Sequence, residues 1–312
     1  MRCRLLLDQF RSFYYRNYPE DMEQCIELFA IFGGLDIEID TSRHTNELII
    51  EHILKKYNRI ALYINNLLFD DVSVKRLLAA LSVGDRRIFS SFKRARLNNL
   101  NGGIALNLLT QNGLIKIEHS REQDKRELKP KLSKEESKHR ISDKFLFVHP
   151  FLRFWFYFIH PHTKEIKNGN FKKVLKDFEQ RKYSYTSLVF EELSRILLSF
   201  HLRDEEIEVI DSYWDANVEV DIMVETKKNN LYIAECKWTN HKVNKKELNK
   251  LIEKCEMMDV YPKQLIFFSK RGFSNELKGM QNNELVLFSV EDFRQLIKSR
   301  PLEATFPLQI FL

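Results

Sequence analysis

Two acidic residues and a lysine lie in two neighbouring apolar runs of the chain, 218–225 and 231–238. Asp221 belongs to the first run, and Glu235 and Lys237 belong to the second. A polar break centred on Lys228 separates the runs, and this pattern predicts a β-hairpin. Because Asp221 and Glu235 are equally distant from Lys228, a regular hairpin places them opposite each other, with Cβ atoms about 5 Å apart. Lys237 shares their face because side chains alternate along a strand.

This group of residues has the parts for metal-assisted hydrolysis of a phosphodiester. Two neighbouring carboxylates repel each other unless a proton or a cation lies between them. Oxygen ligands favour Mg²⁺ or Mn²⁺, and the backbone carbonyl of Cys236 could join Asp221 and Glu235 as a third ligand. Such an ion would activate a bound water, which Lys237 would orient or activate further. The alternative is a solvated charge cluster, because Glu-x-Lys arises by chance in a chain that is 30% charged. The apolar flanks argue against that alternative, because charge on an apolar face is costly.

The acid on one strand and the Glu-x-Lys on the next resemble the signature of the PD-(D/E)xK nuclease superfamily. That resemblance implies a restriction-endonuclease-like fold with Asp221, Glu235 and Lys237 as catalytic residues. Members often carry a further Glu on the preceding helix, and Glu191, in the expected helix 185–200, fits that role. The resemblance also implies Mg²⁺ or Mn²⁺ as the cofactor.

A narrower resemblance covers residues from about 140 to 240. The chain is similar there to the C-terminal domain, of unknown function, that follows the ATPase module in archaeal-type AAA ATPases. Five landmarks occur in the order of that family: His149 to Trp155, Phe190-Glu191, Trp214-Asp215, Asp221, and Glu235 to Trp238. The departure is His149, where the family usually has Asp. No Gly-x-x-x-x-Gly-Lys-Ser/Thr occurs in the sequence, so we expect no ATP binding by this chain.

Composition and length favour a helix-rich globular protein with two or three domains. The 312 residues are 44% hydrophobic, with nine Gly and seven Pro. No apolar stretch reaches the roughly 18 residues that a membrane span needs, and Asp8 ends the first apolar run too early for a signal peptide. The four cysteines lack Cys-x-x-Cys spacing, which argues against a zinc site and against a disulfide scaffold. We therefore expect a cytoplasmic protein without a membrane partner.

The first 160 residues predict helices followed by a winged helix. Apolar stripes indicate helices at 21–32 and 46–68 in a helical region, 1–70. A winged-helix-like domain is expected over 71–160, with helices 74–81, 85–96 and 101–112. Asp85 is expected to cap the second of these helices, and Gly113 is expected to end the third. Strands 114–117 and 145–148 would flank a long charged wing, 118–144, which we expect to be mobile. The aromatic run 151–158 is expected to be a buried packing helix.

The distribution of basic residues bears on how nucleic acid would be bound. The expected recognition helix, 101–112, has no Lys or Arg, which disfavours base readout in the major groove. Arg86 and Arg87 precede it and are candidate phosphate ligands. Lys246, Lys250 and Lys254 recur every four residues, so they share one face of an expected helix. That row could guide a phosphate backbone or could be a solvated face paired with acids. The net charge of +6 is compatible with either.

The remaining residues predict an α/β domain after a basic linker helix, 161–182. The nuclease-like domain, 183–312, would contain helices 185–200, 244–258 and 291–298, and strands 207–213, 218–225, 231–237, 264–269 and 285–289. The expected fold is therefore mixed α/β, and the expected function is metal-dependent hydrolysis of nucleic acid, with DNA favoured over RNA. The alternatives are a non-catalytic module that binds nucleic acid or protein, and a winged-helix transcriptional regulator. A protein partner or a homodimer is left open.

Overall fold

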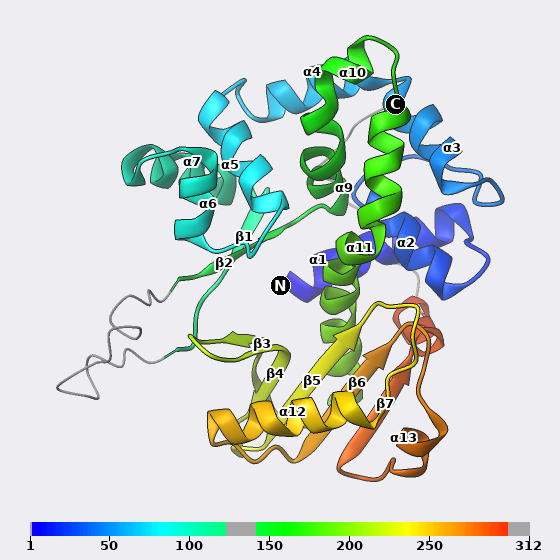
Figure 1. Ribbon diagram of the computed structural model, residues 1–312, viewed down its shortest axis with the longest axis vertical. Coiled ribbons are helices and arrows are strands. Elements are labelled where there is room, and N and C mark those ends of the chain that lie inside the picture. Colours follow the sequence, from blue (N-terminus) through cyan, green and yellow to red (C-terminus); the bar gives the residue numbers. More distant parts are fainter. Residues whose placement is uncertain (1, 123–141, 299–312) are drawn as a thin grey trace. The chain divides into compact units, whose positions relative to one another are not determined.

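The structure, a computed structural model, describes residues 2–122 and 142–298 (Figure 1). The described residues form two units. The first comprises residues 2–118 and 143–185 with 297–298, and the second comprises 119–122, 142 and 186–296. Most of the charged segment expected to be a mobile wing lies outside the described residues. No helix in the described part of the chain combines the length and the hydrophobicity that crossing a bilayer requires.

The first unit begins with helices, as predicted. They are α1 (Arg2–Asn17), α2 (Met22–Phe32), α3 (Thr45–Ile49), a π-helical turn (Ile50–Leu54) and α4 (Tyr57–Leu67). Asp21 caps α2 by accepting a 2.7 Å hydrogen bond from the N–H of Gln24. The expected helical stripe 46–68 is helical but interrupted, because the N–H of Lys55 bonds to the carbonyl of Ile50, five residues back. Apolar periodicity cannot distinguish a π turn from an α turn.

The helices and strands expected for the winged helix are present in the predicted order. They are α5 (Val72–Ser82), α6 (Ile88–Ala95), α7 (Asn99–Gln111), β1 (Ile115–Glu118) and β2 (Lys144–Phe147). Gly113 ends α7 with a φ of +66°, a conformation that glycine adopts at little cost. The expected cap Asp85 is wrong, because α6 begins at Ile88. The Asp85 carboxylate instead accepts a hydrogen bond from the N–H of Arg87 and another from the hydroxyl of Ser90.

The aromatic run packs inside the first unit, as expected. It forms α9 (Pro150–Phe154) and a π-helical segment (Trp155–Ile159), and Trp155 stacks on Tyr57 with ring centroids 5.4 Å apart. A 3₁₀ turn (His160–His162) and α10 (Thr163–Lys167) follow. The linker helix expected at 161–182 is not separate from the next helix. From Lys172 the chain continues as one helix, α11 (Lys172–His201), because it contains no Gly or Pro to end it.

The second unit is built on a five-stranded mixed sheet, which confirms the predicted mixed α/β class. Its strands lie in the order β3 (Ile207–Trp214), β4 (Glu219–Thr226), β5 (Leu231–Lys237), β6 (Gln264–Ser269) and β7 (Leu285–Ser289). The first three strands are antiparallel, whereas β6 and β7 run parallel to β5. The other elements are α12 (Lys245–Met258), α13 (Asn275–Gly279) and η5 (Val290–Ile297). The last is a 3₁₀ helix, where the sequence predicted an α-helix.

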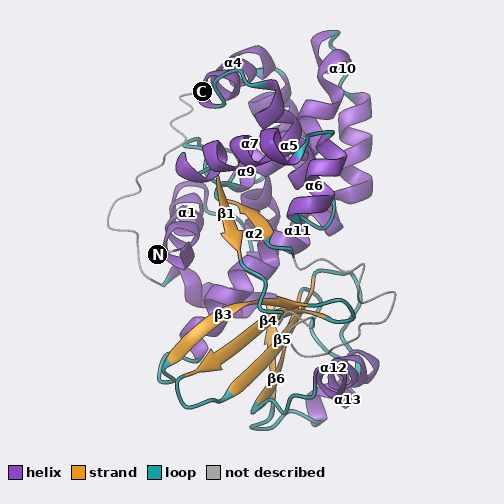
Figure 2. Ribbon diagram, turned by 90° about the vertical axis from the view of Figure 1, so that its left-hand side faces the viewer, coloured by secondary structure: helices purple, strands orange, loops and turns teal. Residues whose placement is uncertain are grey.

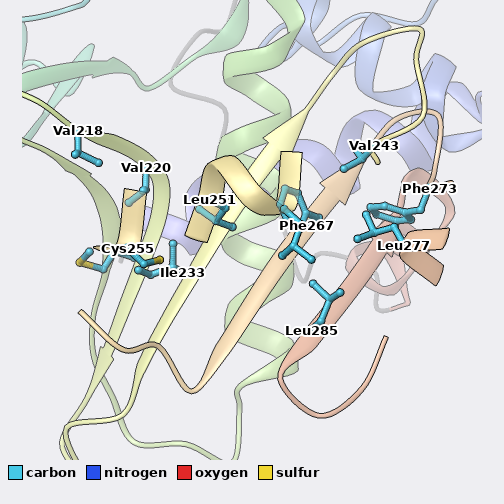
Figure 3. Packing of buried hydrophobic residues seen from close by; sticks show 12 residues of the cluster. Val218, Val220, Ile233, Val243, Leu251, Cys255, Phe267, Phe273, Leu277 and Leu285 are labelled. Atoms are coloured by element: carbon cyan, nitrogen blue, oxygen red, sulfur yellow. The ribbon is translucent and has the colours of Figure 1, made fainter. Parts of the chain in front are cut away.

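Helices cover both faces of this sheet (Figure 2). On one face, Leu251 and Cys255 of α12 belong to a buried cluster with Ile233 and Phe267 of the strands (Figure 3). On the other face, Phe268 packs against Phe293 of η5, which stacks on Phe190 of α11 with centroids 5.0 Å apart. The alternation of side chains along β6 therefore anchors α12 on one face and α11 on the other.

Candidate active site

Strands β4 and β5 pair in the register predicted from the sequence. Met223 lies opposite Ile233, and Ile222 lies opposite Ala234. One step further along, the same register would pair Asp221 with Glu235, but the regular pairing ends at Ile222. There the main-chain N–H of Cys236 donates a 2.8 Å hydrogen bond to Oδ2 of Asp221. The Asp221 side chain thus takes the N–H that would otherwise continue the ladder between the two strands.

A β-bulge lies at the same position on the other edge of β4. Asp211 of β3 pairs with Met223, and Tyr213 pairs with Val220, so two residues of β4 face one of β3. The additional residue falls at Asp221 and Ile222. Bulges bend a strand and redirect a side chain, and they are frequent beside active sites. The bulge and the end of the β4–β5 pairing together place the Asp221 carboxylate where β4 leaves β5, while β4 stays paired with β3 as far as Glu219.

The Glu235 carboxylate is buried and lies between two ammonium groups. The residue is only 4% exposed. Its Oε2 lies 2.9 Å from Nζ of Lys237, and its Oε1 pairs with Nζ of Lys254 from α12. Lys237 also lies 3.6 Å from a carboxylate oxygen of Glu247, again on α12. Glu235 and Lys237 therefore face α12.

The carboxyl of Asp221 lies in a field of negative charge. Its pKa is raised well above the usual value by burial, then by the charge of Glu191 and then by that of Glu235. The hydrogen bond from Cys236 and the charge of Lys237 act in the opposite direction. Glu191 comes from α11, so acids from a helix and two strands act on one another. Glu191, Glu235 and Lys237 are thus close enough to Asp221 for their charges to act on its carboxyl, although Glu191 comes from the helix on the other face of the sheet from α12. Such a group is stabilised by a proton or a cation between the acids.

The Lys237 ammonium stays protonated in this environment. Burial alone would lower its pKa, but the charge of Glu235 and the hydrogen bond to it, with smaller contributions from Asp221 and Glu247, raise the pKa overall. A lysine with a raised pKa is a poor general base near neutral pH. Lys237 is therefore suited to orienting a water or to stabilising negative charge, and it is not suited to removing a proton.

Cys236 can contribute an oxygen but not a thiolate. Burial, followed by the charges of Asp221 and Glu191, raises the pKa of its thiol well above the usual value. The carbonyl of the next residue, Lys237, accepts a 3.1 Å hydrogen bond from the N–H of Lys270, after β6. Since successive carbonyls of a strand point in opposite directions, the Cys236 carbonyl points toward β4 and Asp221.

The types of these oxygen ligands are those that Mg²⁺ and Mn²⁺ accept. Mg²⁺ is usually held by one or two carboxylates and keeps several of its waters. Asp221, Glu235 and the carbonyl of Cys236 match that pattern. Within residues 2–122 and 142–298, no three His, Cys, Asp or Glu side chains lie together as metal ligands. Both oxygens of Glu235 are paired with lysines, so an ion there would compete with an ammonium for this carboxylate.

The predicted lysine row has three different environments. Lys246 is exposed, whereas Lys250 pairs with Glu247 at 2.8 Å and Lys254 pairs with Glu235. In the first unit, Arg86 and Arg87 are only half exposed, and each has a guanidinium nitrogen that is buried without a hydrogen bond to the described residues. Because both side chains are half-buried, these two arginines are less available to phosphates than their sequence position suggested.

Sequence reasoning missed three contributors to the site. Lys254 was expected on a solvent-facing row, but it reaches the acid of β5. Ser194 of α11 lies beside Cys236 and acts on the pKa of its thiol against the larger effect of burial. The ammonium of Lys270 lies 4.9 Å from the ring centre of Trp238, beside the end of β5. For Lys254, the sequence signal is its position in α12 next to Leu251 and Cys255, which face the sheet. No local sequence feature marks Ser194 or Lys270 as part of the site.

Comparison with known proteins gives one match. The model of the DUF234 family, described as archaeal and bacterial proteins of unknown function, matches residues 155–251. The matched stretch includes Glu191, Asp221, Glu235 and Lys237, and it covers less than half of the chain. Neither the search of curated proteins nor the search of solved structures found a match.

Proposed function

We propose that this protein hydrolyses the phosphodiester backbone of nucleic acid, DNA in preference to RNA, with a divalent metal ion. The observation that carries the proposal is the Asp221 carboxyl at the end of the β4–β5 pairing, on which the charges of Glu191, Glu235 and Lys237 act. Burial and the neighbouring acids raise the pKa of Asp221, and groups with a perturbed pKa are common at functional sites.

The order of elements around the site supports the proposal. A helix is followed by three antiparallel strands, a second helix and a strand parallel to the third. This order agrees with the resemblance to the PD-(D/E)xK nucleases described above. Glu191 lies on the first helix, Asp221 on the second strand, and Glu235 with Lys237 on the third. The family match adds no function of its own, because the matched family is one of unknown function.

Each residue of the proposed site has a separate role. Asp221, Glu235 and the carbonyl oxygen of Cys236 would hold Mg²⁺ or Mn²⁺. A bound ion supplies Lewis acidity and lowers the pKa of a bound water. Glu191 would act on Asp221 through its charge. Lys237, protonated and held at 2.9 Å from Oε2 of Glu235, would position the attacking water and stabilise negative charge on the phosphate.

One observation favours a second function, the binding of a protein through the winged-helix-like part. Leu100 and Ile104 lie one turn apart on α7 and are 72% and 53% exposed. The helix carries no Lys or Arg, so its outer surface suits a protein better than a phosphate backbone. This observation weakens the alternative of a DNA-reading transcriptional regulator.

A plasmid assay tests the proposed hydrolysis. Supercoiled DNA would be incubated with the full chain and Mg²⁺ or Mn²⁺, alongside Asp221→Ala, Lys237→Ala and the surface control Glu253→Gln. We expect nicking that requires the ion, falls at least 100-fold in the first two variants and is retained in the control. Salt-sensitive DNA binding without any cutting would leave the non-catalytic module as the better account.

A further inference from the structure

A hollow with apolar walls lies beside the C-terminal end of α12, within the second unit. Its volume is about 400 Å³. The walls are formed by one face of α12, the turn that follows it and the start of β6, namely Ile252, Cys255, Val260, Pro262 and Leu265. Sites for ligands are typically hollows of about 300–1,000 Å³ with mainly apolar walls and a few polar groups. This hollow has the size and the lining of such a site.

The charged groups of the hollow are all acidic. Glu256, Asp259 and Glu284 line it, and no Lys or Arg does. None of these three carboxylates forms an ion pair with another described residue. The nearest lysines in sequence are engaged elsewhere, since Lys254 pairs with Glu235 and Lys263 pairs with Glu205 at 2.8 Å. A ligand with positive charge would therefore meet three carboxylates that have no competing partner.

The rim of the hollow carries an aromatic side chain that little of the protein covers. Tyr261 lines the hollow and is 90% exposed, and Ile252, which also lines it, is 39% exposed. Tyrosine is enriched among the residues that dominate binding at protein interfaces. An exposed tyrosine beside an apolar hollow points to a partner that extends beyond the hollow itself, as a polypeptide does.

We propose that this hollow binds a basic segment of a partner polypeptide. One apolar side chain of the segment would enter between Ile252 and Leu265. Lys or Arg residues on both sides of that anchor would pair with Glu256, Asp259 and Glu284, while Tyr261 would cover it. Nucleic acid does not fit here, because three carboxylates repel phosphates. The inference does not depend on the proposed hydrolysis.

Synthetic peptides provide the test. Each probe would contain one central Leu, Ile, Met, Phe or Trp between Lys or Arg residues, and a matched series would carry Glu in place of the basic residues. Binding to the full chain would be measured by fluorescence anisotropy at two salt concentrations. We expect members of the basic series to bind, more weakly at high salt, and the acidic series not to bind.

Two charge reversals on one helix locate the binding surface. Glu256 lines the hollow, whereas Glu253 is exposed on α12 and does not. We expect Glu256→Lys to weaken the best basic peptide about tenfold and Glu253→Lys to change it less than twofold, with unchanged circular dichroism in both. Ile252→Ser should weaken it as strongly without any change in charge.

Three results would overturn the inference. The first is that no basic peptide binds. The second is that Glu253→Lys and Glu256→Lys weaken binding equally, which would indicate attraction to the whole helix. The third is that the chain self-associates in sedimentation and that Ile252→Ser abolishes the self-association, because a second copy would then occupy the surface.

Discussion

The ammonium of Lys254 in α12 pairs with Oε1 of Glu235 in β5, while Lys237 holds the other oxygen of the same carboxylate at 2.9 Å. A buried carboxylate needs such partners, because an uncompensated buried charge costs several kcal/mol. If Glu235 also binds a divalent ion, the ion and Lys254 compete for one oxygen. The helix that carries Lys254 would therefore act on the affinity of the proposed site for metal.

Replacing Lys254 should strengthen metal binding. In Lys254→Met, Oε1 of Glu235 loses a competing charge, so the affinity for Mn²⁺ should rise at least threefold, because a unit charge a few ångströms away at a partly buried site is worth on the order of 1 kcal/mol or more. Free Mn²⁺ measured by electron paramagnetic resonance gives the affinity. The matched control is Lys250→Met, because Lys250 pairs with Glu247 and not with Glu235. Weaker Mn²⁺ binding in Lys254→Met than in the control would show that Lys254 supports the site.

Replacing Asp221 by an amide should stabilise the protein when no metal is present. Burial and the charges of Glu191 and Glu235 raise the pKa of Asp221, so its ionised form carries an unfavourable free energy in the folded state. The free energy of unfolding therefore falls as the pH rises through the pKa that Asp221 has in the folded protein. Asp221→Asn removes that loss. We expect a gain of about 1 kcal/mol, or about 2–4 °C in Tm, with EDTA at pH 8. The gain should shrink at pH 5, and a lower Tm for Asp221→Asn at pH 8 would contradict this account.

His149 should make the protein sensitive to mild acid. The residue is fully buried in the first unit, where Nδ1 lies 3.0 Å from the amide nitrogen of Gln9. Burial, with a smaller effect from the charge of Lys116, lowers its pKa to about 4. The unfolded state therefore takes up the proton first, and stability present above the usual pKa of about 6.5 is lost as the pH falls toward 4.

The loss attributable to His149 should be about 3 kcal/mol across that range. Urea unfolding at pH 7 and pH 4.5 would measure it, with His149→Gln as the comparison because the amide does not titrate. Gly34 leaves room for the ring, since a Cβ there would lie 2.8 Å from Nδ1. Equal pH dependence in the wild type and in His149→Gln would show that other groups carry the acid sensitivity.

The sequence predicted the α/β domain more closely than it predicted the site within it. The β5, β6 and β7 ranges agree with the structure because each strand is a short apolar run between polar turns. The hairpin register was predicted because polar residues mark its turn. The bulge at Asp221 could not be predicted, since it depends on the pairing of β4 with β3 as well as with β5.

The contacts of Lys254 and Asp85 also depend on tertiary packing that the local sequence does not determine. The spacing of Lys254 placed it correctly on a face with Lys246 and Lys250, but only the packing of α12 on the sheet brings its ammonium to Glu235. Asp85 has the residue type of a cap, but its carboxylate bonds within the turn before α6. Local sequence fixes which residues can form such contacts, and tertiary packing selects among them.

Mn²⁺ titration of the wild type, Asp221→Ala and Glu235→Ala, followed by electron paramagnetic resonance, tests the central claim most directly. The account predicts one bound ion in the wild type and at least a tenfold loss of affinity in each variant, with circular dichroism unchanged. A wild-type isotherm that Glu235→Ala leaves unaltered would remove the metal from this site and, with it, the proposed hydrolysis.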